Sequence, residues 1–295
     1  MSILHKGDKI GFIAPSSGQK NKDLSKAISY FENLGLEVIL AENLNKEYRY
    51  MAGTDKIRAT TINNMFKNND IKALVCIRGG AGSTRILDLI NYNIIKSNPK
   101  PIIGLSDSTS IQNAIFTKTQ TPSFTGFLPL YDFKDENIDK LTAASLENAL
   151  FKDKHKIISG TSLLKGKANG KIIGGCLSTF IYLCGTKYQP DFTDKILLLE
   201  DIGEKTYKID LMLNQLKQQK NFNKLKGIIL GQFTNCSIAD PDDGSIEDCI
   251  NDFVADLKIP VIKDFQYGHI PSRHILPLGI NVEIVSSANS CSISW

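Results

Sequence analysis

An α/β fold is predicted for this chain: a parallel-sheet domain at the N-terminus, followed by an α+β domain with a largely β core. In the first half, short β-rich segments alternate with segments of helical periodicity, which is typical of a parallel sheet covered by helices. After about residue 135 the alternation ends, and one clear helix is mixed with short strands. A length of 295 residues is sufficient for two domains of ordinary size.

The first domain is predicted over residues 1–145. Its predicted strands are short and apolar, at residues 9–15, 36–42, 71–77 and 100–105. The segments between them carry apolar residues at helical spacing, as Leu24, Ile28 and Phe31 do. Helices are therefore expected at residues 22–35, 55–68, 86–90, 106–119 and 135–151. In a sheet of this kind a ligand binds beyond the carboxyl ends of the strands.

A polar segment with glycines, residues 146–165, is interpreted as an irregular crossing between the domains. The second domain is predicted over residues 166–295, with a helix at 206–219. Its expected strands are apolar segments at residues 195–201, 225–233, 281–287 and 290–295.

Composition argues against several classes of protein. The net charge of +4 is spread along the chain, and the densest basic segment, 216–226, has the pattern of a solvated helix face rather than a nucleic-acid site. No apolar run reaches the roughly 18 residues of a membrane span. Six scattered cysteines without a C-x-x-C pair predict neither a disulfide framework nor a zinc site, and no metal or cofactor is expected. The start of the chain lacks the features of a secretory signal, so a cytoplasmic location is expected, or a periplasmic one if an export signal has been removed.

Ser106 lies between an apolar strand and a helix, in the sequence GLSDST. A serine on such a turn is exposed, and the free N–H groups at the helix start can bind negative charge, so Ser106 is a candidate nucleophile. Serine and aspartate are also favoured helix N-caps. Capping by Ser106 or Asp107 is the simpler explanation of this segment taken alone.

The glycine-rich loop RGGAGSTR, residues 78–85, follows another predicted strand. Its glycines can expose consecutive backbone N–H groups to a phosphate or to the oxyanion of an acyl-transfer intermediate. The spacing excludes a P-loop and a dinucleotide fingerprint, and a tight turn without a ligand is the alternative. Arg78 and Arg85 can bind a carboxylate of a ligand or pair with a structural acid.

Glu200 and Asp201 end a predicted strand, and Glu204 follows. A carboxylate at a strand end can hold an imidazole in one tautomer. A pair of carboxylates can also hydrolyse glycosides or bind a metal. Capping of the next helix is the structural alternative.

His269 follows Gly268 in an irregular, proline-bounded segment, which is typical of functional loops. The glycine would allow another backbone or a ligand to approach closely. His274 is the rival candidate base, whereas His5 and His155 lie in polar surroundings typical of the surface.

Taken in chain order, these segments resemble the LD-carboxypeptidase family of serine peptidases, which includes muramoyltetrapeptide carboxypeptidases and microcin C immunity peptidases. The resemblance spans nearly the whole chain. It is carried by the segments GDKIGFIAPSSG, YRYMAGTDKIRA, RGGAGSTR, GLSD, GKIIGGCLSTFIYLCGT, LLLEDIGEKTYKIDLMLNQL and GHIPSRHILPLG.

The resemblance implies a flavodoxin-like N-terminal domain, with the active site between it and the C-terminal domain. Ser106 would be the nucleophile, His269 the general base, and Glu200 the carboxylate that orients the base. The backbone N–H groups of Gly80 and Asp107 would form the oxyanion hole.

The resemblance also implies an activity: removal of the terminal D-alanine from murein tetrapeptides, after meso-diaminopimelate, in peptidoglycan recycling or remodelling. Arg78, with Gly79 beside it, is expected to contact the substrate and to recognise its free carboxylate. Many members carry an aromatic residue where this chain has Ala81, so the neighbouring subsite is expected to differ in shape. A homodimer is expected.

Two alternatives stay open at this point. The same residues could cleave aminoacyl-nucleotide conjugates, as the microcin immunity branch of the family does. From a different class, the chain could be a non-catalytic binding protein whose two lobes close on a small ligand, with the glycine loop as an anion site.

Overall fold

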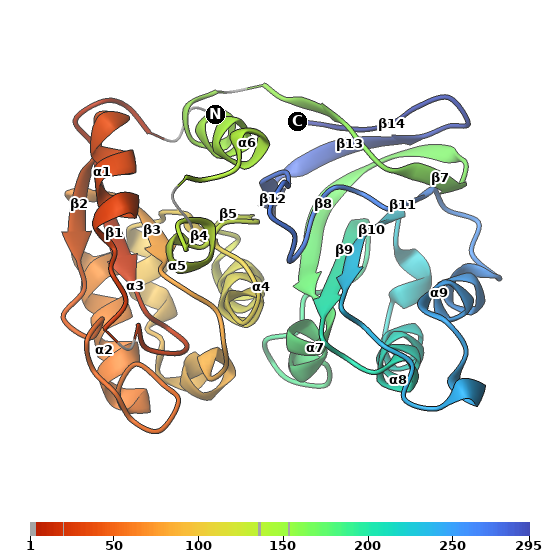
Figure 1. Cartoon of the computed structure of the whole chain (residues 1–295), viewed down its shortest axis with the longest axis horizontal. Coiled ribbons are helices and arrows are strands. Elements are labelled where there is room, and N and C mark those ends of the chain that lie inside the picture. The colour runs from red at the N-terminus through yellow and green to blue at the C-terminus, as the bar shows by residue number, and fades with distance from the viewer. Residues whose placement is uncertain (1–3, 20, 135–136, 153) are drawn as a thin grey trace.

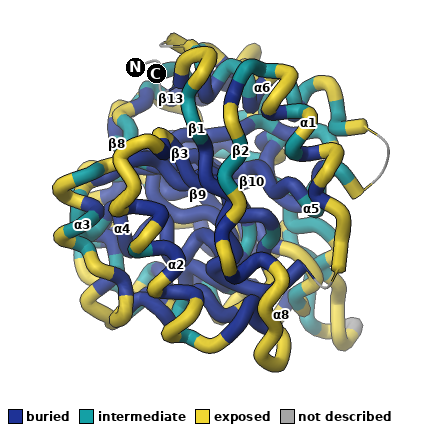
Figure 2. Tube along the Cα trace, turned by 90° about the vertical axis from the view of Figure 1, so that its left-hand side faces the viewer, coloured by how far each residue is buried: buried dark blue, intermediate teal, exposed yellow. Residues whose placement is uncertain are grey.

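The computed structural model describes residues 4–19, 21–134, 137–152 and 154–295. Two lobes lie side by side, each built on one β-sheet (Figure 1). The strands at the centre of each sheet are buried, as the dark interior of Figure 2 shows for β3, β9 and β10. None of the helices in this described part of the chain combines the length and hydropathy of a membrane span.

The first sheet has the strand order β12-β5-β4-β3-β1-β2. Its strands are β1 (Lys9–Ile13), β2 (Glu37–Leu40), β3 (Ile71–Cys76), β4 (Ile102–Gly104), β5 (Ser123–Thr125) and β12 (Leu276–Leu278). Strands β1 to β5 run parallel, in the order of flavodoxin-like folds, so the predicted N-terminal parallel sheet is confirmed. The order reverses between β1 and β3, and ligands bind at such a switch point. The segment after β1 and the glycine loop after β3 therefore lie where a site is expected.

Helices cover both faces of this sheet (Figure 1). They are α1 (Ser25–Asn33), α2 (Asp55–Lys67), the 3-10 helix η1 (Ser83–Leu89), α3 (Tyr92–Ser97), α4 (Ser108–Thr119), α5 (Pro129–Asp132) and α6 (Lys140–Phe151). Local capping explains several of their starts. The side chain of Thr54 accepts a hydrogen bond from the first turn of α2, and Asp139 accepts two from the first turn of α6.

The second sheet has the order β6-β14-β13-β8-β9-β10-β11-β7. Four parallel strands form its centre, β8 (Gly166–Cys176), β9 (Lys195–Ile202), β10 (Gly227–Thr234) and β11 (Val261–Lys263). Antiparallel strands extend it on both sides, β6 (Lys156–Ile158), β7 (Thr161–Leu164), β13 (Asn281–Ser286) and β14 (Cys291–Ser294). The helical elements of this lobe are α7 (Leu177–Phe180), η2 (Ile181–Leu183), α8 (Thr206–Lys217), η3 (Phe222–Lys224), η4 (Pro241–Asp243) and α9 (Ile246–Val254).

Residues 146–165 are more regular than the sequence suggests. They contain the end of α6 and the strands β6 and β7, which pair with β14 and β11. The polar composition reflects their place at the two edges of the second sheet, where strands face water on one side. The helix expected over 135–151 begins at Lys140, and residues 135, 136 and 153 lie outside the described residues.

Strand β12 crosses back between the lobes. It lies within the predicted second domain, 166–295, yet it pairs antiparallel with β5 and completes the first sheet (Figure 1). A strand from the C-terminal half of the chain thus forms one edge of the first sheet, and this pairing connects the lobes in addition to the chain that runs between them. The division into 1–145, 146–165 and 166–295 otherwise stays a prediction.

Helix α4 is packed between the two lobes, and its residues 108–116 are all buried. The side chain of Asn113 donates to the carbonyl of Gly174 at 2.8 Å and accepts from the N–H of Gly174 at 3.0 Å. Gly174 lies two residues before the end of β8, beyond the part of the strand that pairs with β13, and there the Asn113 side chain supplies its hydrogen bonds. One turn earlier, Thr109 Oγ1 accepts a hydrogen bond from the N–H of Cys176 at 3.1 Å.

Asp201 connects the end of β9 to the start of α7. Its carboxylate accepts hydrogen bonds from the N–H and the hydroxyl of Ser178 at 2.7 and 3.0 Å, and from the N–H of Ile202 at 2.8 Å. Burial raises the pKa of Asp201 to about 6, against the opposing effect of these donors. The structural alternative for these carboxylates, capping of the next helix, therefore does not apply to Asp201, because its side chain bonds Ser178 at the start of α7.

Replacing Asn113 by alanine should destabilise the protein by about 3 kcal/mol, because both backbone groups of Gly174 would lose their buried partner. Urea denaturation would measure the free energy of unfolding. Asn64→Ala, an exposed position on α2, is the control. Equal stability of the two variants would contradict the role assigned to Asn113.

Stability should depend on the protonation of Asp201. Because its folded-state pKa is raised to about 6 from 3.8, its favourable contribution is complete below about pH 4 and is lost as the pH rises through 6. Asp201→Asn stays neutral, so its free energy of unfolding relative to the native protein should increase by up to about 3 kcal/mol between pH 4 and pH 7. Denaturation curves across that range check this. The same comparison for Asp70→Asn, an exposed position, should be flat.

Candidate active site

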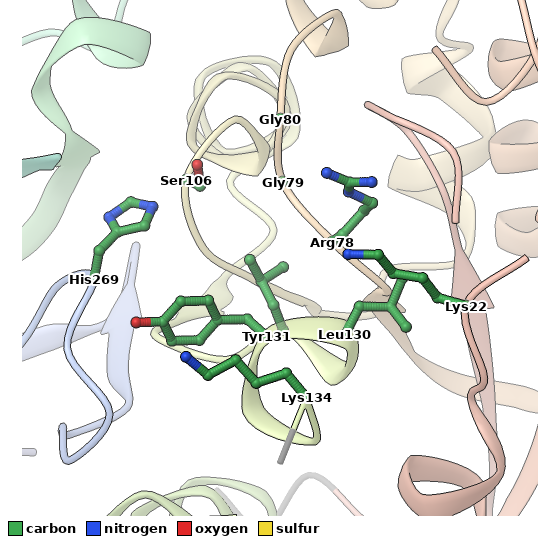
Figure 3. Close-up of a pocket in the computed structure, with 10 residues that line it drawn as sticks. Lys22, Arg78, Gly79, Gly80, Ser106, Leu130, Tyr131, Lys134 and His269 are labelled. Carbon is green, nitrogen blue, oxygen red and sulfur yellow. The ribbon is translucent and has the colours of Figure 1, made fainter. Parts of the chain in front are cut away.

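Ser106 lies on the turn that joins β4 to α4, and its backbone has a φ of 67°. A non-glycine residue pays roughly 1–2 kcal/mol for this left-handed conformation, and such residues cluster at functional sites. Its hydroxyl lies at the edge of a pocket between the lobes (Figure 3). The strand-to-helix turn that the sequence predicts is therefore present, and it is strained.

The simple capping explanation of this turn is wrong for Asp107. Asp107 occupies the N-cap position of α4, but its side chain makes no capping hydrogen bond. The carboxylate accepts a hydrogen bond from the N–H of Ser83 at 2.8 Å, and the Asp107 carbonyl accepts one from the Ser83 hydroxyl at 2.6 Å. Burial raises the pKa of Asp107, and the Ser83 donors oppose that effect. Asp107 thus connects the Ser106 turn to the end of the glycine loop.

The glycine loop packs directly against Ser106. A Cβ added to Gly79 would lie 2.6 Å from the Cβ of Ser106 and 2.8 Å from its Oγ, so only glycine fits there. The loop is held from the other side by Ser17, whose N–H donates to the Gly79 carbonyl and whose hydroxyl accepts from the N–H of Ala81, both at 3.4 Å. Gly80 lies between these two contacts and lines the pocket with Gly79.

The two arginines of the loop have different partners. Arg85 forms a two-bond ion pair with Asp55, with Nε–Oδ1 and Nη2–Oδ2 distances of 3.0 and 2.7 Å. This pairing lowers the pKa of Asp55. Arg78 donates from Nη1 to the carbonyl of Gly18 at 2.8 Å and lines the pocket. Arg85 therefore has a structural acid as its partner, and Arg78 is the arginine available to a ligand.

His269 and Glu200 are in direct contact. The Nδ1 of His269 lies 2.8 Å from Oε2 of Glu200, and the same oxygen accepts a hydrogen bond from the His269 N–H at 3.2 Å. Glu200 is fully buried. A Cβ on Gly268, whose φ is +126°, would lie 2.9 Å from Oε2. The close approach expected at Gly268 is therefore that of the Glu200 carboxylate.

A cavity of about 280 Å³ brings residues of both lobes together. Ser106 comes from the first lobe and His269 from the second, and Figure 3 shows both side chains at the same end of the pocket. The lining residues are Lys22, Arg78, Gly79, Gly80, Ser106, Leu128, Leu130, Tyr131, Lys134 and His269. With Nδ1 facing Glu200, the other ring nitrogen of His269, Nε2, is the one available to a reacting group.

The remaining candidates lie elsewhere. His274 is half-buried against Phe265, with ring centroids 5.9 Å apart, and it is not among the lining residues. Burial lowers the pKa of His274. Glu204 forms an ion pair with Lys208 on α8 at 3.6 Å. In the described residues, no three or more His, Cys, Asp or Glu side chains are arranged to hold a metal ion.

Sequence reasoning missed part of the lining. Lys22, Tyr131 and Lys134 were not predicted to lie near Ser106. Tyr131 faces the His269 ring edge to face, with centroids 6.5 Å apart. Tyr131 and Lys134 follow the carboxyl end of β5, which meets the same edge of the sheet, but a three-residue strand gives too weak a signal to be predicted from the sequence.

Comparison with known proteins identifies the family of this chain. The model of the LD-carboxypeptidase N-terminal domain matches residues 10–126, and that of the LD-carboxypeptidase C-terminal domain matches residues 169–284. A probable murein peptide carboxypeptidase of Bacillus subtilis is 34% identical over 281 residues, covering 94% of this chain and 88% of that protein.

Solved structures show the same fold. An MccF-like protein from Bacillus anthracis superposes with a TM-score of 0.90 at 27% identity, covering 99% of this chain and 98% of that one. A muramoyltetrapeptide carboxypeptidase from Oxalobacter formigenes superposes with a TM-score of 0.89 at 26% identity, covering 97% and 98% of the two chains. The two domain matches and the full-length relatives together confirm the predicted resemblance: the chain belongs to the LD-carboxypeptidase family.

Proposed function

We propose that the protein is a serine-type LD-carboxypeptidase that removes the terminal D-alanine from murein tetrapeptides, after meso-diaminopimelate, in peptidoglycan recycling or remodelling. The observation that carries the proposal is the shared pocket. The strained Ser106 of one lobe faces the same cavity as His269 of the other, and His269 is held by the buried Glu200. The names of relatives in Bacillus subtilis and Oxalobacter formigenes support the substrate class.

In the acylation step, the hydroxyl oxygen of Ser106 attacks the carbonyl carbon between diaminopimelate and D-alanine. Nε2 of His269 takes the hydroxyl proton, and the ring becomes a cation stabilised by the Glu200 carboxylate. The C–N bond then breaks, and His269 passes the proton to the leaving amine of D-alanine. The acyl group stays on Ser106 as an ester.

The tetrahedral intermediate needs donors for its oxyanion. The backbone N–H groups of Gly80 and Asp107 are proposed for this role, since they belong to the loop and the turn that flank Ser106. In the second step water attacks the ester, His269 takes a proton from the water, and Ser106 is released with its hydroxyl restored. Arg78 and Gly79 are proposed to contact the substrate beside the nucleophile.

A cytoplasmic location is proposed for this enzyme, in keeping with a role in peptidoglycan recycling. A homodimer is proposed from the family resemblance.

A second candidate function is cleavage of aminoacyl-nucleotide conjugates. The superposition with the MccF-like protein of Bacillus anthracis favours this possibility. Assaying the purified protein against murein tetrapeptide and against an aminoacyl sulfamoyl adenosine, with mass spectrometry of the products, separates the two. Release of D-alanine at a higher kcat/KM than cleavage of the nucleotide conjugate is expected; the reverse ranking would reject the carboxypeptidase as the main activity.

Two substitutions at Ser106 should separate chemistry from strain. Ser106→Ala and Ser106→Gly should both lower kcat by about 10⁴-fold or more, because both lack the nucleophile. Ser106→Gly should be about 1 kcal/mol more stable than Ser106→Ala, since glycine adopts a φ of 67° without steric cost. Hydrolysis assays and urea denaturation measure the two effects.

Ser97→Ala, an exposed position on α3, is the matched control and should leave both properties unchanged. A Ser106→Ala protein that hydrolyses tetrapeptide at a near-native rate would reject the proposed nucleophile. A labelling experiment with a fluorophosphonate tests the binding-protein alternative, which predicts tight peptide binding without covalent modification of Ser106.

A further inference from the structure

The pocket beside Ser106 is lined by cationic side chains. Lys22, Arg78 and Lys134 all contribute to its wall, and the lining within the described residues includes no aspartate or glutamate. Glu200 is hydrogen-bonded to the His269 ring and is fully buried. A wall of this composition favours an anionic ligand.

Lys22 and Arg78 lie on one side of this pocket. Lys22 comes from the segment before α1, and Arg78 begins the glycine loop. Figure 3 shows both side chains on the side of the pocket away from His269. An anion bound between two cationic side chains is attracted by both charges.

Arg78 is fixed in place for such a role. Its Nη1 donates to the carbonyl of Gly18 at 2.8 Å, which orients the guanidinium and leaves further N–H groups for a ligand. The Lys22 side chain is exposed and can follow the ligand. A fixed planar donor and a mobile ammonium together suit a carboxylate.

A second hollow of about 340 Å³ adjoins the pocket, between the residues around the start of α1 and those around helix α5. The two hollows share Lys22, Leu130 and Lys134. The second one is also lined by Asp23, Lys26 and Phe133. The shared side chains place the second hollow directly beside the pocket that Ser106 lines.

The direction of the peptide follows from the proposed function, on which this inference rests. His269 must protonate the leaving amine, so the departing D-alanine lies on the His269 side. The acyl part of the substrate then extends to the other side, where Lys22 and Arg78 lie. We infer that Lys22 and Arg78 form a subsite for a carboxylate on the acyl part of the peptide substrate, which replaces the role in binding the free terminal carboxylate that the sequence suggested for Arg78.

The acyl part of a murein tetrapeptide carries two free carboxylates that fit this chemistry. One is the second carboxyl group of diaminopimelate, and the other belongs to the glutamate that precedes it. Conversion of either to a primary amide removes the charge and keeps the shape. The affinities of peptides amidated at one position or the other therefore show which carboxylate the subsite binds.

The test measures binding rather than turnover. In the Ser106→Ala protein, isothermal titration would compare the tetrapeptide with its two singly amidated forms. We expect one amidated peptide to bind about tenfold more weakly, because it loses a charge-assisted interaction. In Ser106→Ala with Lys22→Met, the same ratio should fall below about threefold. Ser106→Ala with Lys56→Met, at an exposed site on α2 outside the pocket lining, should keep the full ratio.

Three results would overturn the subsite. The first is that neither amidation changes the affinity. The second is that Lys22→Met leaves the affinity ratio between amidated and unmodified peptide unchanged. The third is that Lys22→Met weakens the binding of all three peptides by the same factor, as the loss of an interaction with the terminal carboxylate would. Failure of the proposed function gives a different result. The native protein would then release no D-alanine from the tetrapeptide, whatever ratio the Ser106→Ala proteins show in binding.

Discussion

The hydrogen bonds between the Asn113 side chain and the backbone of Gly174 hold helix α4 against the second sheet, and the site depends on this contact. Ser106 lies at the start of α4, and Thr109 bonds the N–H of Cys176 at the end of β8. Cys176 in turn is the ladder partner of Glu200 on β9. A series of short, buried hydrogen bonds thus connects the Ser106 turn of the first lobe to the Glu200 carboxylate of the second. Because each bond tolerates only a few tenths of an ångström, the relative position of the lobes is precise.

A buried ion pair holds the His269 loop from the opposite side. Arg273 donates two hydrogen bonds of 2.6 Å to Asp132 on α5, and a third of 2.6 Å to the carbonyl of Ile270. Burial raises the pKa of Asp132, whereas the Arg273 charge acts in the opposite direction. Asp132 follows Tyr131, whose ring faces His269. The imidazole is therefore bounded by the second lobe through Glu200 and by the first lobe through α5, and its ring has little freedom to turn away from the pocket.

Much of the fold could be predicted from local patterns. Alternating apolar segments and helical periodicity indicated the parallel sheet, and the strands 9–15, 36–42, 71–77 and 100–105 correspond to β1 to β4. Very short strands such as β5 and β12 were missed, because three residues carry no periodicity. The sequence predicts an irregular crossing where the edge strands β6 and β7 lie. A half-exposed strand has a polar composition that resembles that of a loop.

The candidate residues could be selected from the chain itself, because Ser106, Glu200 and the glycine loop directly follow apolar strands and His269 lies in an irregular, proline-bounded segment. The family was recognisable for the same reason. The sequence did not decide between His269 and His274 as the base, or between Arg78 and Arg85 as the arginine available to a ligand. It also did not decide between Glu200 and Asp201 as the carboxylate beside the base. The contacts that distinguish these residues join positions 23 to 69 apart in the chain, the Asp201–Ser178, Asp55–Arg85 and Glu200–His269 pairs among them. No local pattern carries such information, since it exists only when two sheets and one buried helix have packed together.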